Sequence, residues 1–256
     1  MGVENKGSEP GVRVLGHYEV AGLLGAGGMG EVYLAHSPSG RAVAVKVIRE
    51  ELADRPGFRE RFAREVAAAR QVSGAFTAPV VDADTTGPVP WMATPYVAGP
   101  SLADRVAASG PLTADAVWQL GSGLAEALRD IHRVGLVHRD FKPGNILLAE
   151  DGPRVIDFGI SRVPDATALT QTGELLGTPP YMAPEQFQSG RDAGPAADVF
   201  ALGAVLVHAA TGHGPFDADG PYAVAWKVVH EDPDLTGLPA SLLPGGRIYS
   251  FDGSAP

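Results

Sequence analysis

Polar side chains gather in the eight-residue stretch HRDFKPGN, residues 138–145. Asp140 offers a carboxylate that can accept a proton from a hydroxyl nucleophile, and Lys142 offers a positive charge two residues later. Asn145 adds a neutral amide oxygen, a ligand type that Mg²⁺ accepts. These groups suit the transfer of a phosphoryl group to a hydroxyl. The alternative is a chance polar run before the apolar segment that follows.

A second carboxylate follows on the carboxyl-terminal side of this stretch. Asp157 ends the β-branched run in VIDFG, where it is well placed to hold a metal ion that bridges phosphates. The later segment GTPPYMAPE carries Thr178, Pro184 and Glu185. Its prolines limit the conformations that the chain loses on binding a peptide. This order indicates a metal ligand followed by a peptide-docking segment.

The glycine-rich sequence LGAGGMGEV places Gly25, Gly27 and Gly30 in the spacing G-x-G-x-x-G. Glycines in such a loop let backbone N–H groups approach phosphate oxygens closely. The spacing alone is equally typical of an ordinary glycine-rich turn. A dinucleotide site needs a helix after the loop, whereas here the strand-like EVYLA follows. The pattern therefore favours a hairpin lid over a triphosphate.

Lys46 ends the apolar sequence AVAVK, inside a predicted strand. A charge there is costly without a partner, although a lysine at a sheet edge can extend its amine into water. Glu65, on the small and apolar half of the next predicted helix, is the candidate partner. A Lys–Glu pair would hold Lys46 against the α- and β-phosphates of a nucleotide.

The elements that must position these groups follow from hydrophobic periodicity. The amino-terminal part predicts strands at 17–24, 31–37 and 41–50, a helix over 55–72, and short strands near 79–82 and 91–95. The rest predicts helices at 101–109, 113–135, 196–211 and 222–231, with Ser101 and Thr113 as the N-caps of the first two and a hairpin around 149–159. One face of the first helix is apolar and carries Phe58, Phe62, Val66 and Ala69. Strands followed by helices predict an α+β fold that divides near residues 96–100.

Composition narrows the classes of function. The chain has 256 residues, of which 45% are hydrophobic, so it can bury a sizeable core. A net charge of −10 argues against general binding to nucleic acid or anionic membranes. Cysteine is absent, and the apolar stretch 199–212 is too short to span a bilayer. We see no signal peptide and expect a cytoplasmic chain without a membrane segment.

Six motifs occur in one order: the glycine loop, VAVK, the helix glutamate Glu65, HRD with Asn145, DFG and APE. Together they resemble the signature set of eukaryotic-like Ser/Thr protein kinases, over roughly residues 17–231. The sequences LLGAGGMGEVYLA and GTPPYMAPEQ are similar to those of bacterial members from actinobacteria. The resemblance implies a bilobal, protein-kinase-like α+β fold. We expect a flexible lead-in over 1–16, an antiparallel-sheet N-lobe with one helix over 17–96, a mostly helical C-lobe over 97–240, and an atypical tail over 241–256.

The resemblance also implies roles for individual residues. Asp140 would be the catalytic base and Lys142 would contact the γ-phosphate, while Lys46 and Glu65 would form the activating ion pair. Asn145 and Asp157 would hold Mg²⁺ or Mn²⁺. Thr94 would be the gatekeeper before a hinge over 95–97. The ATP-binding residues implied in this way are Leu24, Gly25, Ala26, Gly27, Gly28, Met29, Gly30, Glu31, Val32, Ala44, Lys46, Thr94, Pro95, Val97 and Leu147.

The loop that follows DFG indicates which residues kinases of this type would phosphorylate and how their activity would be regulated. Lys142 together with Thr178 resembles Ser/Thr rather than Tyr specificity, so protein substrates are the expected partners. Thr170 and Thr172 match the positions at which related bacterial kinases autophosphorylate, and Arg139 would pair with the added phosphate. Autophosphorylation in trans would need transient self-association. The alternative is that both threonines are solvated loop residues.

Asp198 and several histidines complete the set of candidate residues. Asp198 resembles the aspartate that caps the catalytic-loop backbone in the family, although an aspartate near a helix N-terminus also favours the helix dipole. We expect His138 to be structural. The sequence shows no partner pattern for five others, which we interpret as surface or core residues: His36, His132, His208, His213 and His230.

The carboxyl-terminal sequence departs from the family. Related kinases continue with helices that carry an arginine partner for Glu185, whereas this chain reads GGRIYSFDGSAP. We interpret it as a truncated or rearranged gene product, or as a piece of a longer protein. Three functions follow: an active Ser/Thr kinase, a non-catalytic ATP-binding or scaffolding remnant, or a small-molecule phosphotransferase. The last is disfavoured because that class lacks the peptide-docking segment.

Overall fold

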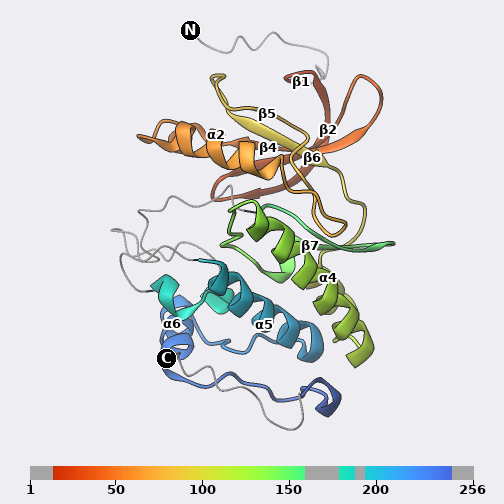
Figure 1. The fold of residues 1–256 in the computed structure, drawn as a ribbon, viewed down its shortest axis with the longest axis vertical. Helices are drawn as coiled ribbons and strands as arrows, with labels where there is room; N and C mark the ends of the chain where they lie inside the picture. The colour runs from red at the N-terminus through yellow and green to blue at the C-terminus, as the bar shows by residue number, and fades with distance from the viewer. Residues whose placement is uncertain (1–13, 159–178, 188–193, 244–256) are drawn as a thin grey trace. The chain divides into compact units, whose positions relative to one another are not determined.

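The computed structural model describes residues 14–158, 179–187 and 194–243 (Figure 1). Within these ranges the chain forms two compact units. One holds the residues up to Val66 together with Val80–Tyr96, and the other holds Ala67–Pro79 together with the residues from Val97 onward. Most of the predicted lead-in and most of the predicted tail lie outside the described residues.

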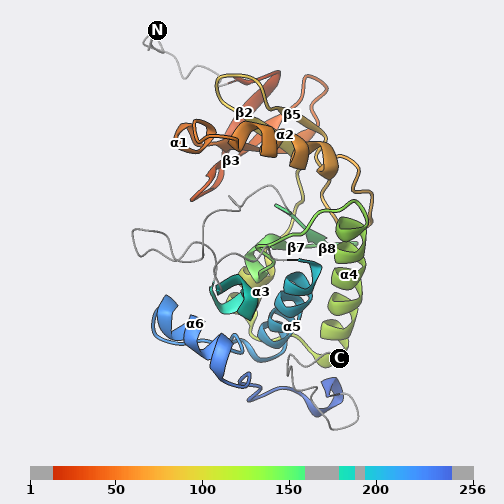
Figure 2. The same ribbon diagram turned by 60° about the vertical axis from the view of Figure 1, so that its left-hand side comes forward.

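The first unit is built on an antiparallel sheet of six strands in the order β1-β2-β3-β4-β6-β5. Helix α2 lies beside this sheet in both Figure 1 and Figure 2. The strands are β1 (Val14–Leu15), β2 (Tyr18–Gly27), β3 (Gly30–His36), β4 (Ala42–Ile48), β5 (Asp82–Asp84) and β6 (Trp91–Pro95). The strand β5 begins three residues after the start of the predicted one, although the N–H of Val81 already donates to Ala93 O of β6 at 2.8 Å.

One face of this sheet forms a hydrophobic core. Along β4, Val43, Val45 and Val47 are buried, and the residues between them point to the other face, as the two-residue period of a strand requires. Tyr18 packs edge-on against Trp91, with ring centroids 5.8 Å apart. The buried members of this core are Tyr18, Tyr33, Ala35, Val43, Val45, Val47, Trp91 and Ala93.

Helix α2 (Phe58–Ala69) presents the predicted apolar face, and its members Phe58, Phe62, Val66 and Ala69 are all buried. The helix begins three residues later than predicted. A one-turn helix α1 (Glu50–Ala53) precedes it and takes up residue 50, which the sequence assigned to a strand. Arg59 fastens α2 to the loop before β6 by donating to the carbonyl oxygens of Gly87 at 2.7 Å and Pro88 at 3.0 Å.

The second unit is mainly helical. Its helices are α3 (Leu102–Ser109), α4 (Ala114–Arg133), α5 (Pro195–Thr211) and α6 (Pro221–His230), with short 3-10 turns η1 (Pro143–Asn145), η2 (Pro179–Tyr181), η3 (Pro184–Phe187) and η4 (Ala240–Leu242). The predicted N-caps are confirmed, because Ser101 accepts from the N–H of Asp104 and Thr113 from that of Ala116. Helices α4 and α5 lie side by side (Figures 1 and 2).

A small hairpin of β7 (Ile146–Ala149) and β8 (Gly152–Val155) lies against α4. The segment after α2 adds to this hairpin: the N–H of Ala78 donates to Val155 O at 3.0 Å, and the N–H of Val155 donates to Phe76 O at 2.8 Å. The ring of Phe76 fills the space above Gly123 and Gly152, where a Cβ atom would contact it. The backbone around residues 76–78 is therefore fixed to the second unit.

Candidate active site

The predicted catalytic loop runs between α4 and β7, and a buried aspartate on α5 holds its backbone. Asp198, 1% exposed, accepts the N–H of His138 on Oδ2 at 2.7 Å and the N–H of Arg139 on Oδ1 at 2.9 Å. A buried carboxylate needs such donors to offset its lost hydration. The structure thus shows Asp198 capping this loop. Its position in the first turn of α5 means that the helix dipole also favours its charge.

Two residues of this region have left-handed backbone. Arg139 has φ 65° and Asp157 has φ 59°, values that non-glycine residues rarely adopt. Such conformations persist where the surroundings over-determine them, and they cluster at functional sites. For Arg139 the surrounding contact is visible, since its own N–H is bound by Asp198. The sequence gives no sign of either conformation, because glycine is absent from both positions.

Asp140, Lys142 and Asn145 come together as predicted. Lys142 Nζ lies 2.8 Å from Asp140 Oδ2, with both side chains about a quarter exposed at 29% and 24%. Asn145 Nδ2 donates to the backbone oxygen of Asp140 at 2.8 Å and to its Oδ2 at 3.3 Å. The loop therefore presents one partly exposed carboxylate flanked by an ammonium and an amide.

The orientation of Asn145 fits a metal ligand. Both partners of Nδ2 are oxygen atoms, so the amide nitrogen faces them and the amide oxygen points elsewhere as an acceptor. The backbone of Asn145 is also fixed, because its O accepts the N–H of Ile156 at 3.0 Å. That bond connects Asn145 to the residue before Asp157. The described residues contain no group of three His, Cys, Asp or Glu side chains suited to a metal. A metal ion held by Asn145 and Asp157 stays a prediction.

His138 is fully buried and packs its ring edge-on against Phe141, with centroids 5.3 Å apart. Its Nε2 lies 3.1 Å from the carbonyl oxygen of Ile156. Burial lowers the pKa of the His138 imidazole by disfavouring the charged form, against the pull of Asp198 and Asp140. The residue therefore supports the loop as a neutral side chain, in agreement with its predicted structural role.

His132 makes a contact that sequence reasoning missed. Its Nε2 lies 2.7 Å from Asp198 Oδ2, although the sequence showed no partner for it. Two other histidines also have specific surroundings. His213 directs both ring nitrogens at carbonyl oxygens, of Gly214 at 3.1 Å and Thr236 at 3.0 Å. Burial lowers the pKa of His208, whose ring meets Tyr181 edge-on.

The glycine-rich sequence forms a tight hairpin in the first unit. Gly27 pairs with Gly30 across a turn of two residues, so a strand follows the loop and not a helix. A Cβ atom on Gly30 would collide with the carbonyl oxygen of Val47 on the neighbouring strand, so the fold itself requires this glycine. Cβ atoms on Gly25, Gly27 and Gly28 would meet no atom within 4 Å. These three leave open room of the kind that a close phosphate contact needs.

Several predicted nucleotide-binding residues share one face of the sheet. Val32 pairs with Lys46, and Ala44 pairs with Thr94. Cross-strand partners, and residues two apart on one strand, point to the same side. That side is opposite to Val43, Val45 and Val47 of the core. Leu24 is 46% exposed on β2.

The remaining predicted residues are spread over other elements. Glu65 lies on α2 in the same unit as Lys46, and the ion pair between them stays a prediction. Val97 and Leu147 belong to the second unit, where Leu147 pairs with Ser101 in an isolated bridge. The residues Thr170, Thr172 and Thr178 lie outside the described residues.

The segment predicted to dock a peptide is described from Pro179. Within it Met182 and Ala183 are buried, and the N–H of Ala183 donates to Oε1 of Gln186 at 2.8 Å. Glu185 lies on η3. No salt bridge of Glu185 is present within residues 14–158, 179–187 and 194–243.

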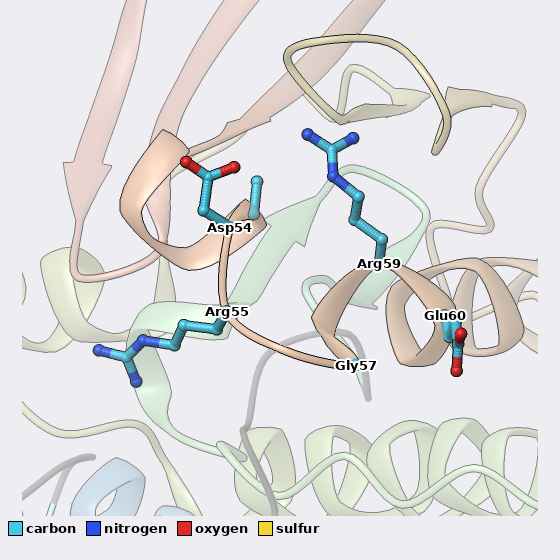
Figure 3. A pocket seen from close by; sticks show the side chains of 6 residues that line it. Asp54, Arg55, Gly57, Arg59 and Glu60 are labelled. Atoms are coloured by element: carbon cyan, nitrogen blue, oxygen red, sulfur yellow. The ribbon is translucent and has the colours of Figure 1, made fainter.

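A shallow cavity of about 320 Å³ lies where α1 meets α2 (Figure 3). It is lined by Ala53, Asp54, Arg55, Gly57, Arg59 and Glu60. These residues carry charges of both signs, and Arg59 is already committed to two carbonyl oxygens. The cavity contains none of the residues that the sequence marked for chemistry, so we do not place the active site there.

The fold and this loop define a class of protein. Residues 18–238 match the family described as protein kinase domain, and the chain belongs to that family. It is 56% identical over 232 residues to the serine/threonine-protein kinase AfsK of Streptomyces coelicolor, covering 91% of this chain and 29% of that protein. It is 53% identical over 228 residues to the probable serine/threonine-protein kinase PkwA of Thermomonospora curvata, covering 89% of this chain and 31% of that protein.

The structural likeness agrees with the sequence likeness. The crystal structure of the PknI kinase domain of Mycobacterium tuberculosis superposes with a TM-score of 0.70 at 28% identity, covering 92% of this chain and 86% of that one. The predicted fold class is confirmed: an antiparallel-sheet unit with a helix and a mostly helical unit. Members of this family use ATP and a divalent metal ion and act on proteins. In the described part of the chain, every helix is too short or too polar to cross a bilayer.

Proposed function

We propose that this chain is an ATP-dependent protein serine/threonine kinase that transfers the γ-phosphate of ATP to Ser or Thr hydroxyls of proteins. The observation that carries the proposal is the partly exposed Asp140 carboxylate, held by Lys142 and Asn145 on a backbone fixed by Asp198. Identity above 50% to named Ser/Thr kinases supports it. The chain spans less than a third of those relatives, so their whole activity does not carry over.

In this proposal Asp140 orients the substrate hydroxyl and accepts its proton. The hydroxyl oxygen bonds to the γ-phosphorus while the bond from that phosphorus to the β-phosphate oxygen breaks, leaving ADP. Lys142, 2.8 Å from Asp140, neutralises charge on the transferring group. Asn145 and Asp157 would hold Mg²⁺ or Mn²⁺, which supplies charge neutralisation at the phosphates. Positioning and electrostatics account for most of such a reaction.

ATP binding is assigned to the hairpin and the sheet face of the first unit. The open glycines 25, 27 and 28 give the backbone room to approach phosphate oxygens. Lys46, supported by Glu65, would contact the α- and β-phosphates. Val32, Ala44 and Thr94 share the face of Lys46 and would contact the base. Pro95, Val97 and Leu147 complete the proposed adenine contacts.

Autophosphorylation in trans at Thr170, Thr172 or both is proposed to regulate activity. A phosphate there adds nearly two negative charges that Arg139 would bind. Transient self-association is part of this proposal. Intact mass and peptide mapping after incubation with Mg-ATP test it. Phosphate on residues 161–180 supports it, and unmodified peptides over this range contradict it.

The experiment that tests the main proposal uses purified chain, Mg-ATP and a generic protein substrate, with Asp140→Asn as the control. Transfer to Ser and Thr by the wild type alone supports the kinase. Equal phosphate incorporation by both proteins contradicts the role of Asp140. Replacing Mg²⁺ by Mn²⁺ or by EDTA in the same assay identifies the metal requirement.

A second candidate is a non-catalytic ATP-binding or scaffolding remnant. The observation that favours it concerns Glu185. Related kinases pair this glutamate with an arginine, whereas the described residues supply no salt bridge to it. A thermal shift with Mg-ATP but no phosphate transfer would select this candidate. In either case we propose a cytoplasmic location and protein partners.

A further inference from the structure

Arg59 stands in the first turn of α2 and connects this helix to the loop between β5 and β6. We propose that Arg59 is a positioning residue for phosphoryl transfer: its guanidinium fixes α2 on the sheet, and α2 in turn holds Glu65 against Lys46. This inference rests on the proposed kinase function and deepens it. Arg59 acts through Glu65, and the contact that carries the inference is the one to the loop.

The guanidinium of Arg59 donates to two consecutive carbonyl oxygens. Nη1 bonds to Gly87 O at 2.7 Å, and Nη2 bonds to Pro88 O at 3.0 Å. A planar guanidinium that is bound through two nitrogen atoms fixes direction as well as distance. Figure 3 shows the side chain extending from the start of α2 in a different direction from that of Arg55. The contact therefore sets the orientation of this end of α2 relative to the loop.

The loop that receives Arg59 is itself well bonded. Asp84 Oδ1 accepts the N–H of Thr86 at 3.0 Å and the N–H of Gly87 at 2.8 Å. A Cβ atom on Gly87 would collide with the Asp84 carboxylate, so the turn is closed tightly around this side chain. Asp84 also pairs with Trp91 across β5 and β6. The two carbonyl oxygens are thus attached to the sheet through a turn that has its own hydrogen bonds.

This sheet also carries Lys46. The strand β6 follows the loop and pairs with β4, where Met92 lies opposite Lys46. Glu65 lies on α2 six residues after Arg59, or about 9 Å along the helix axis. Arg59 and Glu65 are therefore two points of one short helix, and fixing the first restricts where the second can lie.

Apolar packing alone gives α2 less directional support. Phe58 and Phe62 are buried on the apolar face of the helix, and the burial of apolar surface has no preferred direction. The hydrogen bonds of Arg59 supply that direction. Without them α2 can turn or slide on its apolar face and carry Glu65 with it. A misplacement of about 1 Å far from the reacting atoms can reduce the rate as much as a hundredfold.

Two plainer roles would also place an arginine here. One is to stabilise the loop and nothing more, and the other is to add charge to the cavity between α1 and α2. Arg59→Met keeps much of the aliphatic stem and removes both donors. Arg55→Met is the matched control, because Arg55 lines the same cavity, is exposed and points elsewhere (Figure 3). A role in charge alone predicts equal effects of the two variants.

The kinetic test measures kcat of the full chain in the wild-type background and in a Glu65→Gln background. In the wild-type background, we expect Arg59→Met to lower kcat on the order of tenfold and Arg55→Met to keep it. In the Glu65→Gln background, Arg59→Met should lower kcat no further, because residues that act through one contact are not additive. An unchanged kcat in Arg59→Met, or an equal loss in both backgrounds, would overturn the proposal.

A distance measurement reports the position of α2 without any need for activity. The chain contains no cysteine, so Ser39→Cys in the turn between β3 and β4 and Arg64→Cys on α2 can carry two nitroxide labels at exposed positions. Double electron–electron resonance should give one narrow distance distribution in this labelled chain, and the same distribution when Arg55→Met is added. Adding Arg59→Met should broaden or displace the distribution, and an unchanged distribution would overturn the inference.

The two tests separate this inference from the proposed function. If the wild-type chain transfers no phosphate, the proposed function fails. The distance distribution then still decides whether Arg59 fixes α2 on the sheet.

Discussion

The turn between β2 and β3 and the loop between α4 and β7 are both proposed to act on phosphate, but they are held in different ways. The turn is exposed, and its open glycines contact little besides the β ladder. The loop is fixed by a buried carboxylate, carries the strained residue Arg139, and has hydrogen bonds at His138 and Asn145. In the turn, the absence of side chains is proposed to leave room for phosphate. The loop combines supporting hydrogen bonds with the residues that are proposed to carry the chemistry.

This difference predicts how each region responds to substitution. A change in the loop should affect stability and rate together wherever it touches a supporting contact, because buried polar groups lose their partners. A change at an open glycine should affect nucleotide binding and leave the fold intact. The predictions below run from the largest expected effect to the smallest.

Asp198→Ala should produce the largest loss. It leaves two backbone N–H groups and the ring of His132 without their acceptor, inside a region that water does not reach. Breaking such a buried cluster costs about 3–5 kcal/mol of unfolding free energy. Urea denaturation with phosphate transfer measured in parallel tests this. A loss of less than about 1 kcal/mol would mean that the loop is held by other contacts.

Gly30→Ala should destabilise the first unit, because the β ladder leaves no room for a side chain at this position of the hairpin. The new Cβ would collide with the Val47 carbonyl, so β3 or β4 must shift, at a cost of about 1–3 kcal/mol. Gly28→Ala is the matched control, since a Cβ there meets open space. Thermal unfolding of the two variants checks this. Equal melting temperatures would show that the strands adjust freely.

Gly27→Val should weaken ATP binding without destabilising the chain. Valine suits a strand end, and a Cβ on Gly27 meets no atom within 4 Å, but its methyl groups would occupy the room proposed for phosphate. We expect KM for ATP to rise about tenfold, equivalent to about 1.4 kcal/mol of lost binding. Steady-state kinetics over a range of ATP concentrations test this. An unchanged KM would argue against phosphate contact at this turn.

In the second unit, His213 should make a small contribution to stability that depends on pH. Hydrogen bonds to the Gly214 and Thr236 carbonyls raise the pKa of His213 above its ordinary value, with Asp234 and Asp217 adding to the shift. A raised folded-state pKa stabilises the fold fully below about pH 6.5, the unfolded value, and the benefit is lost as pH rises through the folded value.

His213→Gln isolates this contribution. The wild type should exceed the variant in melting temperature most at mildly acidic pH, and the gap should narrow at alkaline pH. Melting curves of both proteins from pH 5.5 to pH 9, roughly the range in which a histidine charge changes, provide the measurement. A gap that is constant or widens with pH would show that His213 binds these carbonyls as a neutral ring.

Much of the fold could be predicted because local signals and packing agree. The apolar face of α2 follows from spacing, the strand that carries Lys46 from its run of valines, and the caps Ser101 and Thr113 from residue type at the helix starts. Boundaries were less accurate. Residue 50 begins α1 although the apolar run before it suggested a longer strand, because the sequence contains no cap or proline to mark the change.

The supporting contacts of the site could not be read from the chain in the same way. His132 and Asp198 are 66 residues apart, and neither a motif nor a period links them. The left-handed backbone of Arg139 and Asp157 carries no local signal, because glycine is the residue that usually marks it. Asp140, Lys142 and Asn145 were predicted together since their spacing is short and their chemistry complementary.

The most direct test of the account compares Asp140→Asn with the wild type in both rate and stability. Asp140 is assigned to proton transfer, so its loss should reduce kcat by about 10²–10⁴-fold while the unfolding free energy changes little, in contrast to Asp198→Ala. The asparagine keeps the volume and one oxygen acceptor for Lys142, which lies 2.8 Å from the Asp140 carboxylate. Near-normal turnover in Asp140→Asn would contradict the assignment of this loop as the catalytic centre.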